Sequence, residues 1–346
     1  MPHEQKRATI SKCCEISVSF PSADGLVRLA GTLALPAGSR PVHAVVLVSG
    51  TGPIDRDVTF VGHALFRTLA EQLAGRGVAS LRFDKRGVGE SEGDFSQAGV
   101  EDFVSDVLGA NEYLVVQGGF ATEHTGLLGH SEGGMVALAA AARAPGTAFC
   151  ISLAGPLLSG RENAVRSFAL LARGSLQRDS QFDRYVSELR TLFQLARSGD
   201  PSLRQAEAEE LAARLAPRVI NKRTRVIFGT ESLSGPEFLG LLSSSCLDTA
   251  LGWNPRRIVP LVRCPVLVLY GGKDVQAPAY ENLSAARTVV AELSKSDWTI
   301  HELADMNHAF QHCETGMPDE YASIRHVMAD DVAEEVVAWI KARMHA

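Results

Sequence analysis

The strongest constraint on the fold is a repeated change in the spacing of apolar residues along the chain. Short apolar runs, such as residues 44–48 and 265–270, alternate with longer stretches whose apolar residues recur at helical spacing, such as residues 100–116. A short run that is apolar throughout and ends at glycine indicates a strand buried on both faces, as in a parallel sheet. Strands that alternate with helices predict an α/β fold with a mostly parallel, doubly wound sheet.

The first strands show a different pattern. In residues 14–20 and 27–35 apolar and polar side chains alternate with period two, and an Asp-Gly turn at residues 24–25 separates the two runs. This pattern predicts an N-terminal β-hairpin. Further strands are expected at residues 78–83, 126–128, 148–153 and 298–303, and helices at residues 63–74, 132–144, 280–293 and 330–344.

The alternation of strands and helices stops in the middle of the chain. Three helices are expected there, at residues 162–173, 182–197 and 202–215. The one ambiguous strand is residues 224–228, and the sheet pattern resumes only at residue 265. We therefore expect a core domain made of residues 1–155 and 256–346, with residues 156–255 inserted as a helical cap, or lid.

Composition excludes several classes of function. The chain has 346 residues, with 45% apolar and 21% charged residues, which is typical of a globular protein with a large core. The net charge is −6 and no dense Lys/Arg run occurs, so we expect no nucleic-acid partner. No apolar stretch approaches the ~18 residues of a membrane span, and no signal peptide is recognisable, so we expect a cytoplasmic protein without membrane contact.

Cysteines are scattered through mostly apolar contexts, at positions 13, 14, 150, 246, 264 and 313. Their spacing does not match a metal site, and adjacent cysteines are a poor candidate for a disulfide, so reduced thiols are expected. We accordingly expect no metal and no cofactor. The sequence indicates nothing about the oligomeric state.

The most informative motif is Gly-His-Ser-Glu-Gly at residues 129–133. It is G-x-S-x-G, placed after an expected strand and before an expected helix, which is the context that a nucleophilic serine requires. The sharp turn points the Ser131 hydroxyl away from the sheet, and the flanking glycines leave room for a strained backbone. The motif predicts Ser131 as a nucleophile, whereas a chance Gly-Ser-Gly turn is the structural alternative.

A nucleophilic serine needs a base and an acid. His308 follows the last expected strand, at the edge of the sheet where α/β folds place their ligands. Asp274 lies just beyond the carboxyl end of the strand at 265–270 and predicts a carboxylate that orients the histidine. Asp305 is a weaker candidate for the acid, because three residues along one loop rarely give the facing geometry. A structural histidine is the alternative for His308.

The third requirement is a pair of donors for the developing oxyanion. The backbone N–H of Glu132, directly after the nucleophile, is expected to supply one of them. The other is expected from Thr51 or Gly52, in the loop after the strand at residues 44–48. The structural alternative is that these glycines only turn the chain.

Four segments of the chain resemble the bacterial α/β-hydrolases typified by EstD-like carboxylesterases. They are residues 49–57, 82–91, 129–134 and 307–311, and the stretch 264–278 around Asp274 also fits. The resemblance extends from about residue 15 to 343 but is specific only outside the expected cap. It implies an α/β-hydrolase fold and hydrolysis of carboxylic esters without a cofactor.

Two charged segments are interpreted as structural. Asp84, Arg86 and Ser91 lie in a D-x-R-G-x-G-x-S loop that resembles a structural turn of these hydrolases. The Asp-Arg-Asp triplet at residues 55–57 is expected to cap a helix or to bridge to Arg86. Either segment could also border the site.

Several functions use the same three groups. The leading prediction is hydrolysis of a small-molecule ester through an acyl-enzyme on Ser131. An acyltransferase or cyclase replaces water with an alcohol or amine, and a thioesterase or peptidase changes the bond that is cleaved. From another class, the chain could be a non-catalytic ligand-binding member of the fold, although such a protein has no need of Ser131, Asp274 and His308 together.

Overall fold

The computed structural model describes most of the chain. The described residues are 13–38, 41–176, 178–196, 205–244, 247–295 and 297–344. Predictions that concern residues 1–12, Arg197, residues 202–204 and Cys246 therefore lie outside the described residues. The other five cysteines are free thiols. Within the described ranges, no helix is long and apolar enough to cross a membrane.

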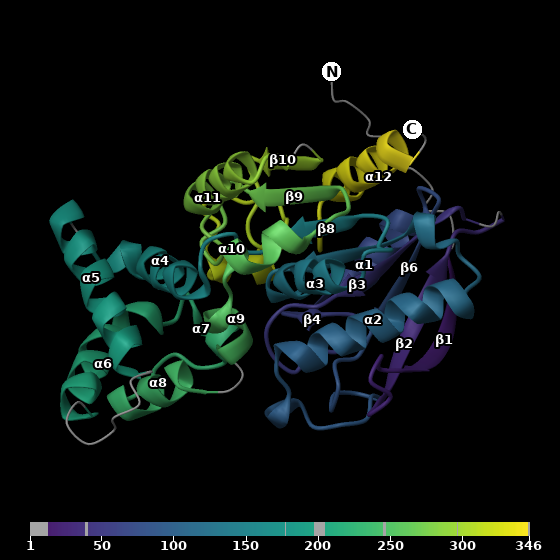
Figure 1. Ribbon diagram of the computed structural model, residues 1–346. Coiled ribbons are helices and arrows are strands. Elements are labelled where there is room, and N and C mark those ends of the chain that lie inside the picture. Colours follow the sequence, from purple (N-terminus) through teal and green to yellow (C-terminus); the bar gives the residue numbers. More distant parts are fainter. Residues whose placement is uncertain are drawn as a thin grey trace.

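The centre of the molecule is an eight-stranded sheet with the strand order β1-β2-β6-β3-β7-β8-β9-β10 (Figure 1). The strands are β1 (Cys14–Pro21), β2 (Arg28–Leu35), β3 (His43–Val48), β6 (Val78–Phe83), β7 (Thr125–His130), β8 (Cys150–Leu153), β9 (Val266–Gly271) and β10 (Trp298–Leu303). All neighbours from β6 to β10 pair in parallel, and β1 and β2 form the predicted antiparallel hairpin. The predicted fold class is confirmed.

Helices cover both faces of this sheet, which explains the uniformly apolar strands. Alternate residues of β3 enter different cores: Val46 packs with α2 (Val100–Val116) and α3 (Glu132–Arg143), and Leu47 packs with α1 (Leu65–Ala74) and α12 (Asp330–Met344). The helix α11 (Ala279–Glu292) joins α2 and α3 on their face. Figure 1 shows α2 and α3 in front of the sheet. Each strand residue in the centre of the sheet therefore contacts an apolar layer.

Two predicted elements differ from the structure. The helix expected at 63–74 begins at Leu65, because residues 63–64 form β5 (His63–Ala64), which pairs with β4 (Thr59–Phe60). Positive φ angles at Val61 and Gly62, 48° and 82°, close that pair with a tight turn.

The ambiguous segment 224–228 is not a strand, because its residues 225–228 form the short helix α7 (Arg225–Phe228). Gly229, with φ 71°, ends the helix by donating its N–H to the carbonyl of Arg225 at 2.7 Å. The β-branched pair Val226-Ile227 favours a strand by propensity, and this local hydrogen bonding outweighs it.

The described residues between β8 and β9 form a block of helices with a separate core. The longer ones are α4 (Gly160–Ala172), α5 (Asp179–Ala196), α6 (Gln205–Val219) and α8 (Gly235–Leu242), followed by α9 (Asp248–Gly252) and α10 (Pro255–Ile258). Tyr185, Leu189, Leu215 and Phe238 belong to their shared core, distinct from the two cores of the sheet. Figure 1 shows α4, α5, α6 and α8 gathered on one side of the sheet.

Both ends of this block are joined by hydrogen bonds. The indole Nε1 of Trp253 donates to the carbonyl of Pro156 at 2.7 Å, and the N–H of Gly160 donates to the carbonyl of Trp253 at 2.9 Å. The two segments that connect the helical block to the sheet are therefore bonded to each other, and we call this junction of residues 156–160 with Trp253 the neck.

Candidate active site

The parallel register brings several loops to one edge of the sheet. Strands β3 and β7 pair Val48 with Gly129, and strands β9 and β10 pair Gly271 with Leu303. Because parallel strands end at the same edge, the loops after β3, β6, β7, β9 and β10 meet there. These loops carry every candidate site residue that the sequence predicts.

Ser131 occupies a strained turn between β7 and α3. Its backbone has φ 57° and ψ −124°, a conformation that costs of order 1–3 kcal/mol for a residue with a Cβ. Two glycines make the turn possible: a Cβ on Gly129 would overlap the carbonyl of Gly133, and a Cβ on Gly133 would overlap the carbonyl of Val48. The N–H of Ser131 donates to the carbonyl of Leu153 at 2.8 Å, which ties the turn to β8. The structure thus places Ser131 on the tight strand-to-helix turn that the motif predicts.

Asp274 and His308 are in direct contact. His308 Nδ1 lies 2.7 Å from Asp274 Oδ2, and Asp274 is 3% exposed. The other carboxylate oxygen, Oδ1, accepts from the backbone N–H groups of Gln276 and Ala277 at 2.7 and 2.9 Å. Because a carboxylate only accepts, Nδ1 of His308 carries a proton, and Nε2 is the ring nitrogen that remains for a substrate or nucleophile. Asp305, the weaker candidate acid, is mostly exposed and pairs with Lys273 instead.

His130 connects the Ser131 turn with the loop that carries His308. Its Nε2 donates to the backbone carbonyl of His308 at 2.8 Å, and the centroids of the two rings are 4.9 Å apart. Burial and the neighbouring His308 lower the pKa of His130 to about 3, so the imidazole is neutral at ordinary pH. This contact was not predicted from the sequence. The buried strand that leads into the motif is the signal that could have indicated it.

The loop after β3 packs directly against Ser131. A Cβ built on Gly50 would lie 3.3 Å from Cβ and 3.8 Å from Oγ of Ser131. The Thr51 hydroxyl donates to Glu132 Oε2 at 3.2 Å, and Gly52 turns the chain with φ 103°. The predicted oxyanion segments, 51–52 and the start of α3, are therefore neighbours on the side of Ser131.

A buried ammonium lies behind these two segments. Lys85, at the carboxyl end of β6, donates from Nζ to the carbonyl of Gly50 at 2.5 Å and to Glu132 Oε1 at 3.2 Å. Lys85 and Glu132 are 5% and 2% exposed. The sequence interpretation did not single out Lys85, although its position directly after a strand that flanks β3 is a signal of proximity to the site.

Comparison with known proteins identifies the family and the fold. Residues 62–314 match the Hydrolase_4 family, described as serine aminopeptidase, S33. The chain belongs to the Hydrolase_4 family. Another similar protein is esterase EstD from Thermotoga maritima, which is 31% identical over 160 residues. That match covers 45% of this chain and only 38% of the length of the relative.

Solved structures share the fold of this Hydrolase_4 protein. The α/β hydrolase GrgF from Penicillium sp. sh18 has a TM-score of 0.57 and 19% identity, over 96% of this chain and 100% of that chain. Est1E from Butyrivibrio proteoclasticus, solved with ferulic acid bound, has a TM-score of 0.55 and 15% identity, over 95% and 100%. The Pyrococcus furiosus esterase Pf2001 has a TM-score of 0.56 and 13% identity, over 96% and 92%. The fold is that of the α/β-hydrolases.

The loop after β6 of this Hydrolase_4 chain supports the sheet edge, as predicted. Arg56 donates from its backbone N–H to Asp84 Oδ1 at 2.7 Å and from Nη2 to Asp84 Oδ2 at 2.5 Å. Burial opposes the charge of Asp84, but the hydrogen bonds from Arg56 outweigh it and hold the pKa of this carboxyl below its usual value. Ser91 donates to the carbonyl of Asp84 at 2.8 Å. These contacts fasten the loops after β3 and β6 to each other.

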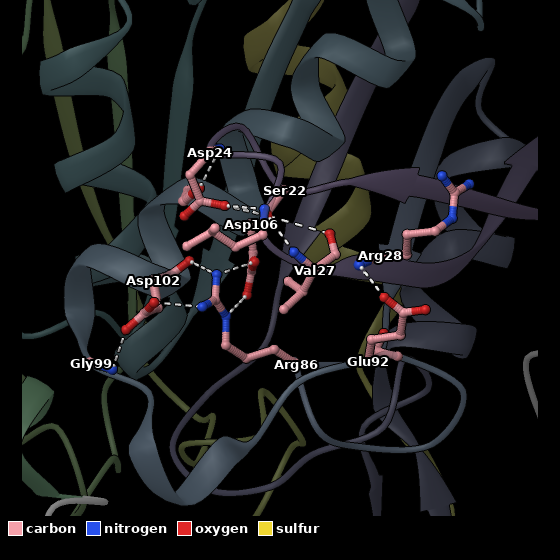
Figure 2. Close-up of polar contacts among 12 residues, drawn as sticks. Ser22, Asp24, Val27, Arg28, Arg86, Glu92, Gly99, Asp102 and Asp106 are labelled. Atoms are coloured by element: carbon pink, nitrogen blue, oxygen red, sulfur yellow. Dashed lines mark hydrogen bonds and ion pairs between the residues drawn. The ribbon is translucent and has the colours of Figure 1, made fainter.

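The expected bridge from residues 55–57 to Arg86 is wrong. Asp57 pairs with Arg82 at 2.6 Å, whereas Arg86 turns toward α2 and bonds both Asp102 and Asp106 (Figure 2). The reason is that Arg82 lies within β6, whereas Arg86 lies in the loop after it, where its guanidinium reaches the two carboxylates of α2. Burial raises the pKa of Asp106 to about 6, against the lowering effect of the Arg86 charge.

Proposed function

We propose that this Hydrolase_4 protein is a serine esterase that cleaves small-molecule carboxylic esters through an acyl-enzyme on Ser131. The observation that carries the proposal is the strained Ser131 turn on the same sheet edge as the buried Asp274–His308 pair. The esterase names of the Thermotoga and Pyrococcus proteins support ester bonds as the target.

In the proposed reaction His308 acts as the base. Ser131 Oγ attacks the ester carbonyl while Nε2 of His308 takes the hydroxyl proton, and the resulting imidazolium is stabilised by Asp274. His308 then gives this proton to the leaving alcohol, and the acyl group stays on Ser131. Water, activated by His308 in the same way, releases the carboxylic acid.

Negative charge develops on the carbonyl oxygen in both steps. The proposed donors are the backbone N–H of Glu132, at the positive end of α3, and the N–H of Thr51 or Gly52. The closeness of Gly50 to Ser131 supports this assignment, because a Cβ built on the glycine would lie 3.3 Å from the Cβ of Ser131. Removing one such donor typically costs about 10²- to 10³-fold in kcat.

Residues 156–255 are proposed to act as a cap over the site. Val275, next to Asp274, and Met317 pack against the core of the helical block. Asn163 of α4 donates to the carbonyl of Gln276 at 3.3 Å, and Arg223 pairs with Asp319 at 2.9 Å. The helices therefore contact the loops after β9 and β10, where they can bind the acyl chain and limit water.

A peptidase is the second candidate, because the matched family is described as serine aminopeptidase. Both candidates use the same groups, since amides and esters are attacked in the same way. The two reactions differ in the leaving group, because an amine must be protonated far more completely than an alcohol before it can leave. The two functions are therefore distinguished by whether the enzyme cleaves an ester bond or an amide bond faster.

The test compares p-nitrophenyl esters of increasing acyl length with aminoacyl p-nitroanilides, using kcat/KM for each. We expect hydrolysis of the esters, its loss in Ser131→Ala, and weak or no cleavage of the anilides. Faster cleavage of the anilides would instead establish a peptidase. Product analysis with added alcohols completes the test, and a transesterified product in excess of free acid would identify an acyltransferase.

A further inference from the structure

Lys85 is a buried cation beside the candidate site that the proposed reaction does not use. Its ammonium lies 4.7 Å from the ring centroid of Phe103 and 5.6 Å from that of Phe95, under the sheet edge. A buried ammonium is destabilising unless its protons are bonded and its charge is paired. The partners that meet this need are the Gly50 carbonyl and the Glu132 carboxylate. Both belong to the segments that are proposed to bind the oxyanion.

The bond to Gly50 determines where the next N–H points. In a trans peptide the C=O of one residue and the N–H of the following residue point in opposite directions, and none of the described peptide bonds is cis. Because Lys85 holds the Gly50 oxygen at 2.5 Å, the Thr51 N–H is directed away from Lys85. A rotated Gly50–Thr51 peptide would present a carbonyl oxygen in place of this donor and would repel an oxyanion.

The bond to Glu132 holds the second segment. The carboxylate of Glu132 accepts from Lys85 with Oε1 and from the Thr51 hydroxyl with Oε2, each at 3.2 Å. Lys85, Glu132 and Thr51 thus form a closed set of contacts that joins the loop after β3 to the first residue of α3. The distance between the two proposed backbone donors depends on this set.

We propose that Lys85 is the positioning residue of the oxyanion hole: it orients the Gly50–Thr51 peptide and fixes that peptide against the start of α3. This inference rests on the proposed serine esterase function. Lys85 does not touch the substrate in this proposal, and its effect reaches the reaction through the Thr51 and Glu132 N–H groups.

The neighbouring ion pair provides a matched control. Asp106 is 1% exposed and bonds Arg86, the residue directly after Lys85, and the side-chain bonds of Arg86 go to Asp102 and Asp106 of α2 (Figure 2). Loss of either pair removes buried charge compensation from the same loop. Only loss of Lys85 should alter the stabilisation of an oxyanion.

The test compares an ester with the matching thionoester, in which sulfur replaces the carbonyl oxygen. Sulfur is a weaker and larger acceptor, so the ratio of the two kcat values reports the hydrogen bonds of the oxyanion hole. For Lys85→Met we expect kcat on the ester to fall about 10- to 100-fold with KM within about threefold, and the ester-to-thionoester ratio to fall with it. Lys85→Gln, which keeps a donor, should give an intermediate ratio. Asp106→Asn should lower the Tm and keep the wild-type ratio.

The possible failures are distinguishable. A folded Lys85→Met variant that keeps the wild-type ester-to-thionoester ratio, even if both substrates are slowed, overturns the positioning role. Ester hydrolysis by the wild type would still support the esterase. Should Lys85→Met not fold, the ratio of Lys85→Gln decides in the same way. A wild-type protein that hydrolyses neither substrate overturns the proposed function and this inference together.

Discussion

Ser131 has a strained backbone conformation that the residues around it must hold in place. Its φ of 57° is outside the regions that residues with a Cβ prefer, and it is held there by the bond from its N–H to Leu153 and by two close glycine contacts. At this position the strained turn holds a hydroxyl at the sheet edge, next to the loop after β3. Strain at the residue scale is thus the physical basis of the proposed nucleophile.

The roles of Ser131 and His308 predict large and non-additive losses. Ser131→Ala and His308→Ala should each lower kcat on an ester by about 10⁴-fold or more, and the double variant should lose little beyond either, because the two groups act as a unit. Ser152→Ala, in the adjacent strand, is the control, since its buried Oγ has no hydrogen-bond partner among the described residues. The measurement is kcat on the ester for each variant, with circular dichroism to check that the variant is folded. Additive losses, or a folded Ser131→Ala that keeps most of its activity, contradict the mechanism.

His130 should make stability depend on pH. Its folded pKa, about 3, is depressed below that of an unfolded histidine, about 6.5, so the stability that it contributes is present above pH 6.5 and is lost as pH falls toward 3. Between pH 7 and pH 5 the unfolding free energy should fall by about 2 kcal/mol more in the wild type than in His130→Gln. Urea unfolding at the two pH values measures this difference. Equal pH dependence in both proteins would show that the pKa of His130 is not lowered in the folded state.

Ser131, Asp274 and His308 belong to a motif or follow a strand, so the sequence alone could indicate them as candidate site residues. The sequence interpretation missed Lys85 and His130, because their roles depend on contacts between distant segments. Lys85 is 35 positions from Gly50 and 47 from Glu132, and His130 is 178 from His308. No local pattern encodes such pairs; they follow from the order of the strands in the sheet.

At the scale of elements, the predicted bounds agree with the structure where the local sequence signals, periodicity and end residues, are complete. The strand β10 (Trp298–Leu303) and the described helix α12 (Asp330–Met344) have the predicted bounds, because their periodicity and end signals agree. The β4–β5 pair and α7 were missed, because each is defined by a glycine turn that acts over only a few residues. The sheet order was also outside local reasoning, since pairing depends on packing between remote strands.

The neck of the helical block makes a prediction about stability. Trp253→Phe removes the donor to Pro156 and leaves a buried carbonyl unpaired, so it should lower the free energy of unfolding by about 1–2 kcal/mol beyond the loss of ring volume. Trp298→Phe removes the same volume from an indole whose Nε1 has no hydrogen-bond partner among the described residues. Trp253 and Trp298 are 7% and 9% exposed, so the pair is matched in burial. Guanidinium unfolding of both variants isolates the hydrogen bond, and equal losses would contradict its role.

At the scale of the whole molecule, the proposed reactive groups and the proposed substrate contacts come from different parts of the chain. Ser131, Asp274 and His308 all follow strands of the central sheet, whereas the helical block packs on the loops at Val275 and Met317. The reaction of a small reagent with Ser131 should therefore depend on the sheet and its loops. Preference among acyl chains should depend on the block.

The most direct test of the central claim is covalent labelling of the folded protein by a small fluorophosphonate, with the adduct located by mass spectrometry. Such a reagent reacts with a serine only when a base and an oxyanion hole activate it. We expect one adduct per chain, on Ser131, with ester hydrolysis lost in proportion to labelling and no adduct in Ser131→Ala. An unlabelled wild-type protein, or an adduct elsewhere with ester hydrolysis intact in Ser131→Ala, contradicts the account.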